Sequence, residues 1–386
     1  MYISEVISNT ARIPTVTPAM EFIELDAARR ERAKASYNTR RVDVARATQL
    51  LTGDVCPQAG DLVLARVEKI GQHARIERPD GRRASLFHGD EIIVCYGARY
   101  APDQFESYLP TDLGPCHLVA AGGVASLSVN RHKRMKAPTA IQPLGLLTDA
   151  DGGRINLKDW GLPKAPVSTR RPLTIAVVGT AMNAGKTTVA ASLVRGLKRA
   201  GQRVGAAKIT GTGAGGDRWA LLDSGADSVY DFTDTGVPST FGLEPQQIQT
   251  IFSQLTHHLA IEGVDVVVLE IADGLYQTET AALLASPLFA AGVDHLLFAA
   301  SDALGAKAGV EHLAQLGLQT SAVSGVLTSS PLASREAAQV LDVPVVETRA
   351  LTRASWLAEH LAEADRVEVI PAQPASLSYA VSSSWV

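Results

Sequence analysis

The sequence contains few cysteines, few aromatic residues and no long hydrophobic run, and each shortage argues against a class of protein. Only three cysteines occur in 386 residues, and Cys56, Cys95 and Cys116 share no close spacing. This argues against a disulfide framework or a zinc site and favours a reducing compartment. No apolar run reaches the roughly 18 residues of a membrane-spanning helix. The N-terminus lacks the basic start and apolar core of a signal peptide, so we expect a cytoplasmic protein without a membrane partner.

The charge balance gives no support for nucleic acid as a partner. The net charge is −4, and aromatic residues, which stack on unpaired bases, make up only 5% of the chain. Hydrophobic residues make up 46%, which is ordinary for a globular protein with a sizeable core. We therefore do not expect nucleic acid to bind, and the length favours two or three domains.

The first 165 residues change pattern near residue 50. Residues 1–50 are polar and locally basic, and we interpret them as a partly helical, solvated segment; a basic arm for acidic ligands is the alternative. Residues 51–165 alternate apolar and polar positions between tight turns at residues 79–81 and 151–153. This alternation predicts a small antiparallel β domain, such as a partly open barrel. Its basic run at residues 130–136 is either a charged loop or a holder of an acidic substrate.

A different pattern begins after a linker that contains three prolines, at residues 161–172. Over residues 172–365, helical periodicity alternates with short apolar runs, which predict strands at residues 173–178, 203–209, 264–270, 295–300, 321–327 and 343–347. Continuous apolar strands between helices are typical of a parallel sheet covered on both faces. The predicted fold class is therefore α/β: a mainly parallel sheet flanked by helices, preceded by a smaller β-rich domain. Residues 366–386 are interpreted as a tail.

The stretch "LTIAVVGTAMNAGKTT" has the ending of a phosphate-binding loop, although its spacing is unusual. Thr180 stands where the first glycine of the common motif belongs, and Gly179 leaves five residues before Gly185. The apolar strand before it and the helical pattern after it supply the context that such a loop needs, because backbone N–H groups at a helix N-terminus converge on an anion. We therefore predict nucleotide contacts from the following residues: Gly179, Thr180, Ala181, Met182, Asn183, Ala184, Gly185, Lys186, Thr187 and Thr188. In this prediction Lys186 contacts the β- and γ-phosphates, and the Thr187 hydroxyl binds Mg²⁺.

Three further residues are candidates for the same site. Glu270 ends an apolar run at the sheet edge where α/β proteins bind ligands, so it is either a Mg²⁺ ligand or an acid that faces solvent. Lys208 ends another predicted strand, where it either neutralises charge on a transferring phosphoryl group or lies on the surface. Asp217, after the glycine-rich segment "GTGAGG", is a second candidate Mg²⁺ ligand. Polar residues farther on are candidates for a substrate pocket: Asp234, Thr235, Ser239, Tyr276 and Thr278.

The order of these segments resembles dethiobiotin synthetase, an ATP-dependent ligase. "GTAMNAGKTT" is similar to its "GTDTxVGKT" loop, and "VVVLEIADGL" is similar to its strand ending "VVEGAGG". The same branch of P-loop proteins includes cobyrinic acid amide synthases and the molybdopterin-guanine dinucleotide accessory protein. "VGAAKITGTG" resembles the second strand of the family, and "GVLTSSPLASREA" and "VPVVETRALTRAS" resemble its two late loops that hold the base. The resemblance covers about residues 172–365.

The resemblance implies ATP and Mg²⁺ as cofactors and a homodimer as the assembly. It also implies catalytic roles for Lys186 and Lys208, metal binding by Glu270, and a base-binding position at Thr328 or Ser329. The family's acidic loop residue is replaced here by Ala181 or Met182, and its base-reading asparagine by Thr328 or Ser329. No N-K-x-D guanine motif occurs, which favours ATP.

Two functions follow from these residues. The first is an ATP- and Mg²⁺-dependent enzyme that activates a small acidic substrate by phosphoryl transfer, where positioning and charge neutralisation dominate. The second is a nucleotide-dependent switch or accessory protein, in which nucleotide binding orders the loops at residues 211–216 and 231–242.

Overall fold

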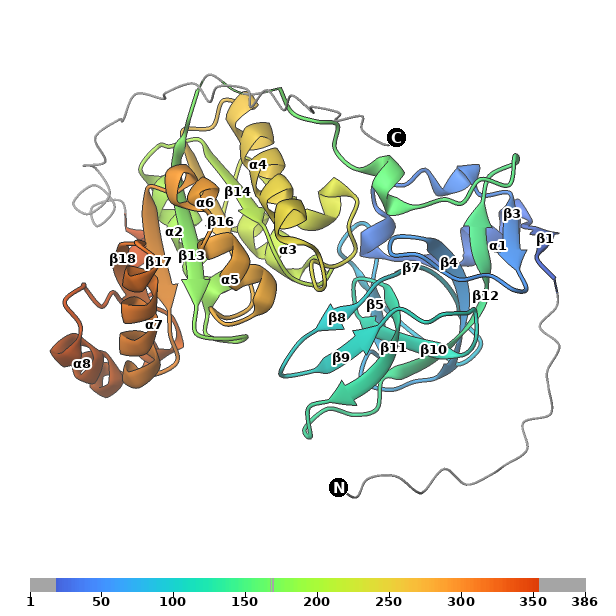
Figure 1. Cartoon of the computed structure of the whole chain (residues 1–386), viewed down its shortest axis with the longest axis horizontal. Helices are drawn as coiled ribbons and strands as arrows, with labels where there is room; N and C mark the ends of the chain where they lie inside the picture. The colour runs from blue at the N-terminus through green and yellow to red at the C-terminus, as the bar shows by residue number, and fades with distance from the viewer. Residues whose placement is uncertain (1–18, 167, 169, 354–386) are drawn as a thin grey trace, which may run out of the picture.

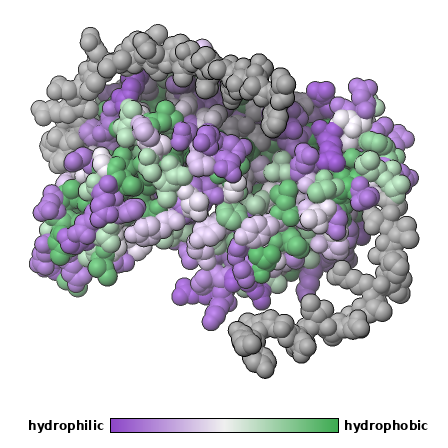
Figure 2. All heavy atoms as spheres, in the orientation of Figure 1, coloured by the Kyte–Doolittle hydropathy of each residue, from purple (hydrophilic) through white to green (hydrophobic). Residues whose placement is uncertain are grey.

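Two large β-sheets divide the chain into an N-terminal part and a C-terminal part (Figure 1). The computed structural model describes residues 19–166, 168 and 170–353. The strands of the first sheet lie between Glu21 and Thr148, and those of the second lie between Leu173 and Ser324. The predicted tail at residues 366–386 lies outside the described residues. Among the helices of the described ranges, none has the length and apolar character that crossing a membrane requires. On the face seen in Figure 2, hydrophilic and hydrophobic residues are interspersed over both parts.

The N-terminal part consists mainly of short strands. Its strands are β1 (Glu21–Glu24), β2 (Lys34–Ala35), β3 (Gln49–Thr52), β4 (Leu62–Lys69), β5 (Arg75–Glu77), β6 (Arg83–Ser85), β7 (Glu91–Tyr96), β8 (Arg99–Tyr100), β9 (Phe105–Tyr108), β10 (Cys116–Ala120), β11 (Val124–Arg131) and β12 (Thr139–Thr148). Its helical turns are α1 (Ala27–Arg32) and the 3₁₀ turns η1 (Tyr37–Thr39), η2 (Val44–Arg46) and η3 (Leu157–Trp160).

Five of these strands close into a ring. β12 pairs with β4, β4 with β7, β7 with β11, β11 with β10, and β10 with β12. Alternate side chains such as Val63, Val94 and Leu118 fill the interior, and the closure leaves these strands without open edges. The barrel is thus closed rather than partly open. The β7–β11 pair is parallel, against the antiparallel prediction, because the chain passes through the β8–β9 hairpin and β10 before it returns to β7.

The two predicted tight turns have different outcomes. The first joins β5 and β6 as a hairpin, with Gly81 at the positive φ of 83° that the turn requires. The second follows β12, where the Asp149 carboxylate accepts a hydrogen bond from the Gly153 N–H at 2.8 Å. Beyond that turn the chain forms only isolated bridges, from Arg154 to Thr148 and from Asn156 to Asp61, so the second strand predicted there is wrong.

The C-terminal part contains a parallel six-stranded sheet in the order β15-β14-β16-β13-β17-β18. Its strands are β13 (Leu173–Gly179), β14 (Val204–Lys208), β15 (Ser228–Asp231), β16 (Val266–Glu270), β17 (His295–Ala299) and β18 (Thr320–Ser324). Its helices are α2 (Lys186–Arg199), α3 (Gly216–Asp223), α4 (Pro245–Ile261), α5 (Thr278–Leu284), α6 (Pro287–Gly292), α7 (Ala303–Gln315) and α8 (Pro331–Val340), with 3₁₀ turns η4 (Phe232–Thr235), η5 (Val326–Ser329) and η6 (Ala350–Thr352).

Helices cover both faces of this sheet. Ile175 and Val177 of β13 pack with α2 and α3, whereas their neighbours Ala176 and Val178 pack with α4 to α8. Because successive strand residues point to opposite faces, continuous apolar strands bury both faces. The predicted fold class is confirmed: a parallel sheet flanked by helices, preceded by a smaller β-rich region.

Two details of the sheet differ from the prediction. The run at residues 343–347 forms only one bridge, between Val323 and Val345, because Pro344 has no N–H to continue a ladder. β15 was not predicted, since its four residues alternate between buried and half-buried positions and lack a continuous apolar run.

The basic N-terminal segment is solvated only in part, because α1 has no buried residue whereas Arg40 packs against the C-terminal part. The Arg40 guanidinium lies 3.1 Å from the Asp231 carboxylate and 2.6 Å from that of Asp234, and only 10% of its side chain is exposed. Arg29 pairs with Glu91 of β7. These two arginines therefore stabilise the fold. Because Asp234 forms an ion pair with Arg40, its carboxylate does not line the predicted substrate pocket.

Candidate nucleotide site

The predicted phosphate loop connects β13 to α2, and we call residues 179–188 the P-loop. The Lys186 ammonium folds back over the loop and donates a hydrogen bond to the Ala181 carbonyl at 2.7 Å. Gly185 has a φ of 97°, in the left-handed region that favours glycine. A Cβ on Gly179 would lie 2.7 Å from the Ala299 carbonyl of β17. The first glycine is therefore needed where the loop leaves the sheet, which explains the spacing of five residues.

The Thr187 hydroxyl lies between two carboxylates. Its oxygen is 2.9 Å from Asp217 Oδ1, in the first turn of α3, and 2.9 Å from Glu270 Oε1, at the end of β16. The structure thus brings together three predicted residues that are 30 and 83 positions apart in the chain. Glu270 is buried, so the alternative of a solvent-facing acid is wrong.

These three side chains offer the oxygen ligands that Mg²⁺ prefers. A hydroxyl has one proton and can donate to only one of two carboxylates at a time. The second oxygen of Glu270 is buried without a hydrogen-bond partner among the described residues, and such a group is costly unless it is satisfied. Within residues 19–166, 168 and 170–353, no cluster of three or more His, Cys, Asp and Glu residues could hold a metal. The set therefore fits a cation that takes its remaining ligands from phosphate and water.

Lys208 forms the cationic side of this cluster. Its ammonium pairs with Asp217 and lies 4.0 Å from Glu270, and 14% of its side chain is exposed. It is thus not a surface lysine. Burial, followed by the nearby charge of Asp217, raises the pKa of Glu270 to about 7, against the lowering effect of Lys208. Burial likewise acts to raise the pKa of Asp217, but the Lys208 ammonium holds it below its ordinary value.

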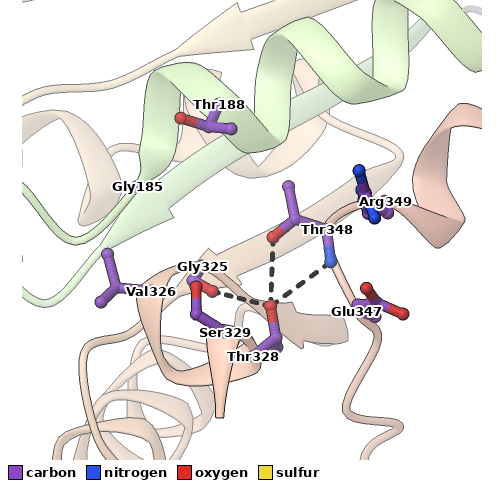
Figure 3. A pocket seen from close by; sticks show the side chains of 9 residues that line it. All are labelled: Gly185, Thr188, Gly325, Val326, Thr328, Ser329, Glu347, Thr348 and Arg349. Carbon is purple, nitrogen blue, oxygen red and sulfur yellow. Dashed lines mark hydrogen bonds between the residues drawn. The ribbon is translucent and has the colours of Figure 1, made fainter.

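A pocket of about 350 Å³ opens on the other side of the P-loop (Figure 3). It is lined by Gly185, Thr188, Gly325, Val326, Thr328, Ser329, Glu347, Thr348 and Arg349. The predicted base-binding residues Thr328 and Ser329 are both in this wall. The Thr328 hydroxyl donates to the Gly325 carbonyl at 2.8 Å and accepts from the Thr348 N–H at 3.3 Å, so it joins the two late loops.

Two charged residues of this pocket were missed by sequence reasoning. Glu347 and Arg349 lie beside Thr348 in the segment "VPVVETRALTRAS", which the resemblance placed at the base without naming individual residues. The loop of Val326 is fixed to the P-loop, because the Val326 N–H donates to the Ala184 carbonyl at 3.0 Å. The pocket is therefore continuous with the phosphate loop.

Other candidates lie apart from this cluster. Tyr276 is 79% exposed and packs against the His312 ring, and Thr278 begins α5 at the surface. Met182 and Asn183 are on the outer side of the P-loop, where the Asn183 amide donates to the Asp103 carboxylate at 2.6 Å. That bond links the P-loop to the turn between β8 and β9 of the N-terminal part.

The strand–loop–helix unit at residues 173–199 and the parallel sheet around it have the arrangement that P-loop NTPases use. The strand-end carboxylate Glu270 lies on the strand adjacent to β13, with Thr187 and Lys186 opposite it. Ligands of open α/β sheets bind at this carboxyl edge of the strands.

Comparison with known proteins found similar solved structures only. No family model matches the sequence, and no curated protein matches it. Similar solved structures include the signal recognition particle receptor FtsY from Elizabethkingia anophelis, which is 18% identical, with 46% of this chain and 59% of that chain covered and a TM-score of 0.30. The signal recognition particle 54 kDa protein from Aeropyrum pernix K1, in complex with GDP, is 19% identical, with 51% and 47% covered and a TM-score of 0.34. FtsY from Mycoplasma mycoides is 12% identical, with 54% and 74% covered and a TM-score of 0.33.

This chain spans about three fifths of the first receptor and about half of the 54 kDa protein. At these identities and TM-scores, no activity is carried over from those proteins.

Proposed function

We propose that the chain is a P-loop enzyme that binds ATP with Mg²⁺ and transfers the γ-phosphoryl group. The observation that carries this proposal is the position of the Thr187 hydroxyl between Asp217 and Glu270, next to Lys186. Thr187, Asp217 and Glu270 would hold Mg²⁺, which would supply positive charge to neutralise the phosphoryl group as it moves. Lys186 and Lys208 would add positive charge on the protein side.

The finer form of the proposal follows from the resemblance to dethiobiotin synthetase. In that form the acceptor is a small acidic molecule, ATP is the nucleotide, and the enzyme is a homodimer. The pocket with Thr328, Ser329 and Glu347 would take the base, and its volume of about 350 Å³ suits a ligand of that size.

Calorimetry with ATP and with GTP, each with and without Mg²⁺, tests the core of this proposal. We expect ATP to bind more tightly than GTP, and Mg²⁺ to strengthen the binding. A chain that binds neither nucleotide would refute the proposal. Phosphoryl transfer to a panel of carboxylic acids, followed by ADP release, tests the finer form.

A second candidate function is a nucleotide-dependent switch, and one contact favours it. Glu77 of β5 accepts hydrogen bonds from the Gly215 N–H at 2.9 Å and from the Trp219 indole at 2.6 Å. These two donors flank Asp217, so a shift of Asp217 on metal binding would reach the N-terminal part. Hydrogen exchange of β5 and β6 with and without Mg²⁺·ATP tests this candidate. Exchange that stays the same would rule it out.

A further inference from the structure

A second recess lies where the N-terminal part meets the P-loop side of the sheet. Its wall includes Tyr100 of β8, Thr212 after β14, Thr240 and Phe241 before α4, and Asp273 and Gln277 after β16. In Figure 1 the β8–β9 hairpin points toward the C-terminal part, and the Tyr100 and Phe241 rings lie 5.5 Å apart. The recess holds about 10 Å³, which is room for one water-sized group.

This recess is next to the predicted phosphate site. A Cβ on Gly274 would lie 2.5 Å from the Thr180 carbonyl and 3.1 Å from the Ala181 Cα. The segment after β16 therefore packs directly against the P-loop at Gly274, and Asp273 is the residue before it. Tyr100 comes from the other part of the molecule, so neither part forms the recess alone.

Asp273 is the only carboxylate among the residues that line the recess, and no lysine or arginine lines it. Within the described residues, its carboxylate takes part in no hydrogen bond or ion pair, unlike Asp217 and Glu270. Burial raises the pKa of Asp273, while the charges of Lys186, Lys208 and Arg99 act to lower it. A half-buried carboxylate with an elevated pKa is a stronger base than an exposed one.

We propose that this recess is the nucleophile subsite of the enzyme, that one hydroxyl group occupies it, and that Asp273 binds and deprotonates that hydroxyl. The proposal rests on the proposed phosphoryl transfer and takes a hydroxyl as the acceptor, in place of the carboxylic acid of its finer form. The volume fits water best; the hydroxyl of a small alcohol is the second source of the same chemistry. A carboxylate acceptor would instead meet the negative charge of Asp273 at short range.

The hydroxyl oxygen forms a bond to the γ-phosphorus while its proton passes to the Asp273 carboxylate. The bond between the γ-phosphorus and the oxygen that bridges to the β-phosphorus breaks, and its electron pair leaves with ADP. The products are ADP and either inorganic phosphate or a phosphate ester, and Asp273 then releases its proton to solvent.

The test compares Asp273→Asn with a matched control, Asp302→Asn, at the same edge of the sheet. Asp302 caps α7 through the Gly305 N–H at 2.7 Å, and asparagine caps a helix equally well. With Mg²⁺·ATP, we expect Asp273→Asn to lower kcat for phosphate release about a hundredfold and to leave the ATP Kd within about twofold. The Asp302→Asn variant should behave like the wild type.

A second variant, Tyr100→Ala, tests the shape of the recess. Removing the ring should widen it, so in the presence of glycerol the ratio of glycerol phosphate to inorganic phosphate should rise above that of the wild type, as measured by ³¹P NMR. Wild-type kcat in Asp273→Asn would overturn the proposal. So would a wild-type chain that binds ATP yet produces neither phosphate nor ester. Failure to bind ATP at all would instead refute the proposed function.

Discussion

Two clusters of carboxylates among the described residues differ in how completely their hydrogen-bonding and charge requirements are satisfied. At the junction between the two parts, Asp231 and Asp234 face the Arg40 guanidinium, and the Tyr37 hydroxyl donates to Asp231. In the P-loop cluster, Asp217 and Glu270 share one hydroxyl and one lysine, and a Glu270 oxygen has no partner among the described residues.

The difference separates a structural cluster from a candidate site. At the junction the protein itself supplies the cations and donors that two buried carboxylates need. In the P-loop cluster one oxygen of Glu270 has no such partner among the described residues, and burial raises the pKa of this residue to about 7. Incomplete satisfaction of a buried acid is costly, so it points to a ligand that completes the set.

The largest expected effect is on stability, from Arg40→Leu. This change leaves Asp231 and Asp234 buried without their cation, which costs about 3–5 kcal/mol of unfolding free energy. Urea denaturation measures it. The control is Arg29→Leu, whose ion pair with Glu91 is partly exposed (34% and 26%) and should contribute less than about 1 kcal/mol. Equal losses in the two variants would contradict the contrast between a buried structural pair and an exposed one.

The second prediction concerns binding rather than stability. Lys186→Ala removes a charged hydrogen-bond donor from the phosphates, so the Kd for Mg²⁺·ATP should rise at least about tenfold. Its free energy of unfolding without nucleotide should stay close to that of the wild type, unlike that of Arg40→Leu. Calorimetry and urea denaturation on the same preparation provide both values. An unchanged Kd would count against the phosphate contact.

The third prediction concerns the pH dependence caused by Glu270. Its pKa of about 7 is above the ordinary 4.5, so between these values the folded chain binds a proton that the unfolded chain does not. The contribution of this residue to stability therefore falls as pH rises from about 4.5 to 7. Glu270→Gln removes this loss of stability and should be about 3 kcal/mol more stable than the wild type at pH 8.

At pH 4.5 the stability difference between Glu270→Gln and the wild type should nearly vanish. Comparing the two proteins cancels the titration of all other groups, provided that they titrate alike in both. Denaturation curves over pH 4.5–8 measure it, and a difference that does not vary with pH would contradict the elevated pKa.

The local sequence pattern was enough to predict the P-loop and most strands of the C-terminal sheet. Five of the six predicted runs in the C-terminal part are strands, because buried parallel strands are short, continuous and apolar. Thr187, Glu270 and Lys208 were named as candidates because each lies at the end of a recognisable element. Glu270 and Lys208 kept open alternatives, because strand and loop patterns do not say which loops meet.

Only the tertiary structure showed how the N-terminal part contacts the elements around the candidate nucleotide site. The bonds of Tyr37 and Arg40 to Asp231 join residues that are 194 and 191 positions apart, and Trp219 reaches Glu77 across 142 positions. A periodic pattern reports which face of an element is buried, but not which distant element covers it. For the same reason, barrel closure, the buried role of Arg40 and the recess between Tyr100 and Asp273 emerged only from the packing of the two parts against each other.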